Sequence, residues 1–166
     1  AFAAWDEVLE DCLDPVGPPF ARLTGAIGGM RAILFGADIP LRLIISYDQL
    51  SRSVRLVTAF LFRYPSHLVL DESHRIKAGT TSQRGQAALS IAHIAVRRDI
   101  LSGTPLPNSV DDLAAQLDFL WPSQGIGQRI RVAGRPREVL APFYVRTRKS
   151  ELPLGPDDGL RVRSVA

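Results

Sequence analysis

The chain has 166 residues, of which 46% are hydrophobic and 22% are charged, so it can form one domain with a core. Its formal net charge is +3, and its single cysteine, Cys12, excludes an internal disulfide and a cysteine-based zinc site. No stretch reaches the roughly 18 apolar residues of a membrane span, so we expect no membrane partner. Acidic residues follow Trp5 at once, so the first residues do not resemble a signal peptide, and the single cysteine favours a reducing interior, so we expect an intracellular protein.

The first 65 residues alternate helical patterns with short apolar runs. A glycine-rich stretch at 25–29 predicts a turn or the start of a helix. It is not a phosphate-binding loop, because no lysine follows the glycines. Pro65 ends the helical pattern of residues 48–63. The expected elements are an amphipathic helix at 3–13, strands at 20–24 and 41–46, and a helix at 48–63.

The stretch from Leu68 to Lys77 carries the most informative chemistry. Its three leading apolar residues predict a strand buried on both faces, as in a parallel sheet. Asp71 and Glu72 follow at the carboxyl end, where open α/β sheets bind ligands. Two carboxylates there are costly unless a cation meets them. Magnesium with a nucleotide phosphate is one candidate, and a solvated acidic turn is the other.

A second strand tip is expected to meet the first. Residues 82–97 have the apolar spacing of a helix, in which we expect His93 to be structural. A buried strand at 99–101 then runs into Ser102. The 31 residues from Asp71 to Ser102 fit one strand–helix–strand crossover. Such crossovers are right-handed, so both tips should lie on the same edge of the sheet.

The last third of the chain begins with a capped helix and becomes basic. Ser109 and Asp112 have capping-box spacing at the start of a helix that ends at Trp121. The Gly- and Arg-rich residues 123–137 predict a loop, followed by a short helix at 136–140. Seven cations against one acid over residues 129–149 suit a polyanion or, equally, a solvated basic loop.

Four ordered blocks resemble the first RecA-like lobe of the Swi/Snf-related ATPases, a DNA-translocase family within helicase superfamily two. Residues 45–50 are similar to the family's Ser-Tyr-acid-x-Leu block. Residues 71–77 are similar to Asp-Glu-Ala-His-Arg-Ile-Lys, with Ser73 in place of alanine. Residues 101–108 are similar to Leu-Thr-Gly-Thr-Pro-Leu-Gln-Asn, and residues 144–149 to Leu-Arg-Arg-Thr-Lys.

The resemblance implies an α/β fold, namely an incomplete parallel-sheet RecA-like lobe flanked by helices. It implies that residues 1–150 form this ATP-binding lobe and that 151–166 are an interlobe linker or the start of the next lobe. The implied cofactors are ATP and Mg²⁺, and the implied partner is double-stranded DNA.

The resemblance also implies the roles of individual residues. Asp71 would lie near Mg²⁺, through water, and Glu72 would activate the attacking water. His74 would act as a relay towards the second tip. The residues implied to bind the nucleotide are Asp71, Glu72, Ser102, Gly103 and Thr104. Those implied to contact DNA are Tyr47, Arg146, Arg148 and Lys149.

One departure from the family is large. The phosphate-binding loop should precede Trp5 and the second lobe should follow residue 166, and neither is in the chain. We therefore expect part of a larger ATPase that is inactive alone and has the phosphate-loop segment and second lobe as partners. The alternative is a non-catalytic truncated module that binds DNA or a protein. A different P-loop ATPase, such as an RNA helicase, is disfavoured by residues 75–77 and 104–108.

The basic residues also suggest a source. Eighteen of the 20 are arginine, which we attribute to a GC-rich coding genome. This bias predicts a bacterial cytoplasm or nucleoid rather than a nucleus.

Overall fold

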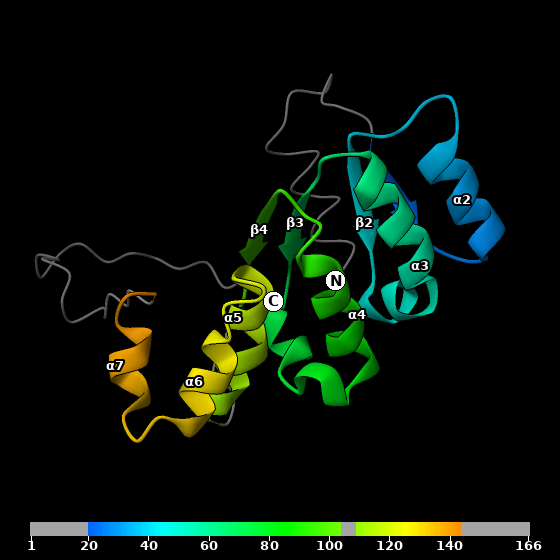
Figure 1. Cartoon of the computed structure of the whole chain (residues 1–166). Helices are drawn as coiled ribbons and strands as arrows, with labels where there is room; N and C mark the ends of the chain where they lie inside the picture. The colour runs from blue at the N-terminus through cyan, green and yellow to red at the C-terminus, as the bar shows by residue number, and fades with distance from the viewer. Residues whose placement is uncertain (1–19, 104–108, 144–166) are drawn as a thin grey trace, which may run out of the picture.

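The computed structural model describes residues 20–103 and 109–143, which form a mixed α/β structure (Figure 1). The predicted helix at 3–13, Thr104 and the basic block at 144–149 lie outside these residues. The strands are β1 (Phe20–Leu23), β2 (Arg42–Ile45), β3 (His67–Leu70) and β4 (Arg97–Ile100). The helices are α2 (Ile27–Phe35), α3 (Tyr47–Arg63), α4 (Gln83–Ala92), α5 (Ala114–Leu120), α6 (Ile126–Val132) and α7 (Pro136–Leu140). Short 3₁₀ helices occupy Ser73–Ile76, Gly79–Thr81 and Val110–Leu113.

The four described strands form two parallel pairs. β1 pairs with β2, and β3 pairs with β4, with His67 opposite Arg97 and Leu70 opposite Ile100. Parallel strands need a crossover, which α2 provides for the first pair and α4 for the second. Alternating strands and helices with parallel pairing confirm the predicted class, a partial RecA-like α/β lobe.

The second strand pair is buried on one face, so the expectation of a strand buried on both faces was wrong. Leu70 packs against small residues of α4 and against Phe119 of α5. On the opposite face Val69 is 45% exposed, and His67 forms an exposed contact of 2.8 Å with Asp99. Three consecutive apolar residues indicate that a strand has a buried face, but they do not indicate whether other elements cover both faces of the sheet.

Three apolar clusters hold the elements together. The first packs α2 and α3 with β1 and part of α4, around Met30 and Phe60. The second joins the β3–β4 pair to α4 and α5. The third joins α5 to α6 and α7. Figure 1 shows this order, with α2 and α3 beside β2, α4 central, and α5 to α7 on the other side. Among the described helices none is long and apolar enough to cross a membrane.

Two helical predictions need correction. The helix expected at 82–97 ends at Ala92, and His93 follows it as an exposed capping residue. The loop expected at 123–137 contains helix α6, whose Ile126 and Ile130 are buried against Leu113 and Leu117. The many glycines and arginines obscured this i, i+4 apolar pair. The capping box of Ser109 and Asp112 and the short helix α7 are confirmed.

Helix α6 lies very close to α5 because residue 127 is a glycine. The Gly127 N–H donates to Asp118 Oδ1 over 2.8 Å. A Cβ at residue 127 would lie 2.3 Å from Asp118 Oδ2 and 2.6 Å from the Ala114 carbonyl oxygen. The closeness of the two helices therefore depends on the missing side chain.

Replacing Gly127 by alanine should lower the free energy of unfolding by about 1–3 kcal/mol, because the added methyl group overpacks this contact. A urea titration measures the change. Gly134→Ala is the matched control, since nothing lies within 4 Å of the Cβ it would add. Equal stability of the two variants would show that α5 and α6 do not pack this closely.

Candidate functional site

The ends of β3 and β4 meet at one edge, as the crossover argument predicted. The Leu101 N–H donates to the Leu70 carbonyl over 2.8 Å, and the Ser73 N–H donates to the Leu101 carbonyl over 2.9 Å. These bonds extend the pairing beyond both strands. The Asp71–Glu72 turn is therefore held beside the segment that begins with Ser102.

Glu72 has a backbone conformation that is unusual for a residue with a side chain. Its φ of 50° and ψ of 49° lie in the left-handed region. This conformation costs roughly 1–2 kcal/mol for a non-glycine residue. The surrounding contacts maintain it: the Glu72 N–H donates to Asp71 Oδ1 over 2.9 Å, and Ser73 is fixed by its bond to Leu101. Strained residues held in this way concentrate at functional sites.

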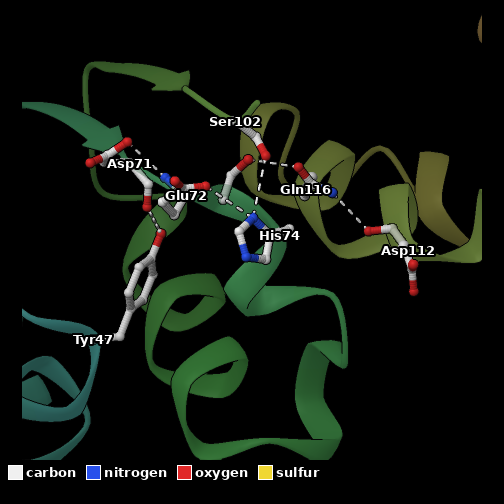
Figure 2. A network of polar contacts seen from close by, with 8 residues as sticks. Tyr47, Asp71, Glu72, His74, Ser102, Asp112 and Gln116 are labelled. Carbon is white, nitrogen blue, oxygen red and sulfur yellow. Dashed lines mark hydrogen bonds and ion pairs between the residues drawn. The ribbon is translucent and has the colours of Figure 1, made fainter. Parts of the chain in front are cut away.

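His74 connects the two tips. Its Nδ1 lies 3.2 Å from Glu72 Oε2 and 3.4 Å from Ser102 Oγ. Figure 2 shows the imidazole between the carboxylate and the hydroxyl. An N–H at Nδ1 can donate to both, so a proton on this nitrogen links Glu72 to the second tip. The structure thus brings together three predicted site residues.

Tyr47 lies on the other side of the turn. Its hydroxyl donates to the Asp71 carbonyl oxygen over 2.8 Å (Figure 2). Burial, with the nearby Asp71 carboxylate, raises the pKa of Tyr47 to about 12, so the hydroxyl remains a donor at neutral pH. The predicted DNA-contacting residue therefore also supports the carboxylate turn. Its role towards DNA remains a prediction.

A basic hollow of about 580 Å³ opens beside His74. Arg75, Lys77 and Arg84 contribute to its lining. Arg84 donates to both carboxylate oxygens of Asp48, over 2.7 and 3.0 Å. This pairing holds the pKa of Asp48 below its usual range.

Asp71 and Glu72 bring two carboxylates to the edge where β3 ends. Among the described residues no three His, Cys, Asp or Glu side chains gather closely enough to form a metal cage. Mg²⁺ commonly uses one or two carboxylates with water and substrate phosphates. Asp71, at the carboxyl edge of the strands, suits that mode of binding.

Two supporting residues were missed from the sequence. Gln116, on α5, is fully buried and hydrogen-bonds Ser73. A polar residue among the apolar positions Leu113, Leu117 and Leu120 was the available signal. The second missed residue is Arg98, which donates to three helix-end or loop carbonyls. Its neighbours in the sequence are also polar, so nothing in the local pattern singled it out.

The parallel strand pairs, with two carboxylates at a strand tip, are consistent with a partial RecA-like α/β lobe. The SNF2-related domain family matches residues 40–127. Helicase ssl-1 of Caenorhabditis elegans is 33% identical over 130 residues, covering 66% of this chain and 5% of that protein. The TATA-binding protein-associated factor MOT1 of Saccharomyces cerevisiae is 36% identical over 106 residues, covering 64% and 5%. The SWI/SNF chromatin-remodeling complex subunit snf22 of Schizosaccharomyces pombe is 41% identical over 56 residues, covering 34% and 3%.

The chain belongs to the SNF2-related family, a group of helicase-like ATP hydrolases. This confirms the resemblance seen in the four sequence blocks. The chain spans only about 5% of the length of the first relatives described above. The activities of those whole proteins can therefore only be proposed for this chain.

The expected bacterial location was wrong. The three relatives are eukaryotic, and the name of snf22 refers to chromatin remodelling. These findings contradict the expected bacterial cytoplasm. The error arose because the ratio of arginine to lysine follows the base composition of a genome, which does not distinguish the two kinds of cell.

Proposed function

We propose that this chain supplies the carboxylate half of an ATP-hydrolysing site in a DNA-dependent translocase. The observation that carries the proposal is His74 Nδ1 between the Glu72 carboxylate and the Ser102 hydroxyl at the edge where the two strands end. Hydrolysis of a phosphoanhydride needs positioned charges more than covalent chemistry by the protein. A carboxylate linked to a second strand tip suits such positioning.

Each residue has a proposed task. The Asp71 carboxylate would hold Mg²⁺ through water, and the bound ion would neutralise charge on the phosphates. The Glu72 carboxylate orients the attacking water and accepts its proton. His74 stabilises the Glu72 carboxylate through Nδ1. The same nitrogen contacts the Ser102 hydroxyl, so a change at the carboxylate affects the hydrogen bond to Ser102. Nucleotide binding is also assigned to Ser102, Gly103 and Thr104, and the hydroxyl groups of Ser102 and Thr104 would couple the nucleotide state to DNA contacts.

DNA contacts are proposed for Tyr47, Arg146, Arg148 and Lys149. The cationic residues among these would contact backbone phosphates, which carry no base sequence. The full-length protein should therefore hydrolyse ATP faster with duplex DNA, and DNA affinity should fall steeply as salt rises. A steady-state ATPase assay with and without duplex DNA, repeated across salt concentrations, tests this. Absence of hydrolysis in both conditions would refute the proposal.

The alternative is a truncated module that binds DNA or a protein without catalysis. It is favoured by the absence of a Gly-x-x-x-x-Gly-Lys-[Ser/Thr] loop from the 166 residues. Such a loop binds phosphates through its backbone N–H groups and its lysine, and these 166 residues do not supply that motif. We expect the isolated chain neither to bind ATP tightly nor to hydrolyse it. Micromolar ATP affinity in a nucleotide titration of the isolated chain would contradict this expectation.

A further inference from the structure

A buried polar bridge connects the carboxylate turn to helix α5. Ser73 and Gln116 are both 0% exposed. The Ser73 hydroxyl donates to Gln116 Oε1 over 2.7 Å, and Gln116 Nε2 donates to the Asp112 carbonyl over 2.9 Å. Figure 2 shows this chain of bonds on the side of the turn that faces α5. The Gln116 amide therefore has a defined orientation, with its oxygen towards the turn.

The bridge acts on the residue between the two predicted catalytic groups. Ser73 directly follows Glu72, with its left-handed backbone, and directly precedes His74. Its main chain is fixed to Leu101, and its side chain is fixed to α5. Tyr47 holds the turn from the opposite side, at Asp71. The strained turn is thus restrained on three sides, and α5 supplies the third restraint.

The other end of the bridge is also anchored. Asp112 belongs to the capping box: its Oδ2 accepts the Ser109 N–H over 3.2 Å, and its own N–H donates to the Ser109 carbonyl over 3.1 Å. The start of the α5 segment is therefore well defined before Gln116 reaches the turn. A buried amide with fixed hydrogen-bond partners holds those partners in place, because any other arrangement would leave a buried polar group without a hydrogen bond, which is costly.

We propose that Gln116 is a positioning residue for ATP hydrolysis, acting through Ser73 to hold Glu72 and His74 in register with the Ser102 tip. This inference rests on the proposed function. Leucine at residue 116 has a similar volume but leaves the buried Ser73 hydroxyl without its acceptor. The turn must then move to satisfy the hydroxyl, and small displacements of catalytic groups are costly to rate.

The test compares variants of the full-length protein in a steady-state ATPase assay with duplex DNA. Gln116→Leu should lower kcat about ten- to hundredfold while changing the KM for ATP less than about twofold. Adding Ser73→Ala to Gln116→Leu should restore most of kcat, because both partners of the bond are then apolar. Gln86→Leu is the matched control, because it makes the same substitution at an exposed glutamine of α4.

The possible outcomes distinguish a failure of the role inferred for Gln116 from a failure of the proposed ATP-hydrolysing function. Loss of kcat in Gln116→Leu with recovery in the double variant supports the inference, since a purely structural role would lower the unfolding temperature without this recovery. Unchanged kcat in Gln116→Leu overturns the inference and leaves the proposed function standing. A double variant as slow as Gln116→Leu also overturns it, because the effect would not pass through Ser73. No hydrolysis by the wild-type protein overturns both.

Discussion

Replacing Glu72 by glutamine in the full-length protein should lower kcat for ATP hydrolysis by about 10²- to 10⁴-fold and leave DNA affinity unchanged at a fixed salt concentration. The loss follows because an amide cannot accept the proton of the attacking water, which is worth this much in general base catalysis. Glutamine keeps the length and volume of the side chain. The left-handed backbone at this residue is therefore under the same constraint in both proteins.

The geometry explains why DNA binding should survive. The Glu72 carboxylate is half exposed and contacts His74, whereas the backbone of the turn is held by Leu101 and Tyr47. Removing the charge alters the proposed catalytic group without removing these supports. A steady-state ATPase assay and a DNA titration measure the two effects.

Glu138→Gln is the matched control for this substitution. Glu138 lies on α7 and forms an exposed ion pair with Arg135 over 2.9 Å. Exposed pairs of this kind contribute little, so both ATP hydrolysis and DNA affinity should remain at wild-type values. Wild-type hydrolysis in Glu72→Gln would remove Glu72 from the mechanism, and loss of DNA binding would show that the substitution disturbs the lobe itself.

Replacing Arg98 by methionine should lower the free energy of unfolding by about 2–3 kcal/mol, the range for losing hydrogen bonds from a charged donor. Arg98 Nε donates to the carbonyl of Leu120, the last residue of α5, over 3.0 Å. Its Nη1 donates to Ala92, the last residue of α4, over 2.9 Å, and to Ala95 over 2.6 Å. The cation lies at two helix carboxyl ends, where the helix dipole favours positive charge.

The neighbouring arginine provides the control. Arg97 has a side chain that is 70% exposed and lies 3.2 Å from Asp99 on the open face of the sheet. Arg97→Met should cost less than about 1 kcal/mol, because exposed ion pairs are weak. Urea titrations of the two variants in the same background measure the difference. Equal losses would mean that Arg98 does not clamp α4 and α5.

The candidate site was largely predictable because its parts are local in sequence. An apolar run followed by two acids indicates a strand tip, and the distance from Asp71 to Ser102 indicates a single crossover. Together these place the two tips at one edge, and the structure places His74 between them. The supports of the site were not predictable in this way. Tyr47 and Gln116 reach the turn from residues 24 and 43 positions away, and no local pattern encodes such contacts.

The sequence also could not predict which faces of the strands are covered by helices. The pattern of Leu68 to Leu70 reports apolar character, but Val69 is substantially exposed because α4 and α5 cover only the other face. The same limit applies to Gly127, which occurs in a stretch that resembles a loop in composition. Its importance arises from the close approach of Asp118 on another helix.

The sequence by itself determined the class of this protein: the order of its motifs, the alternation of strands and helices, and the carboxylate pair at a strand tip follow from local residue patterns. Only the tertiary structure decided how that tip is held. It revealed the left-handed Glu72, the buried bond between Ser73 and Gln116, and the clamp of Arg98 on two helix ends. These features depend on which distant groups meet in the folded chain, and the physical cost of leaving a buried polar group unpaired makes each meeting specific.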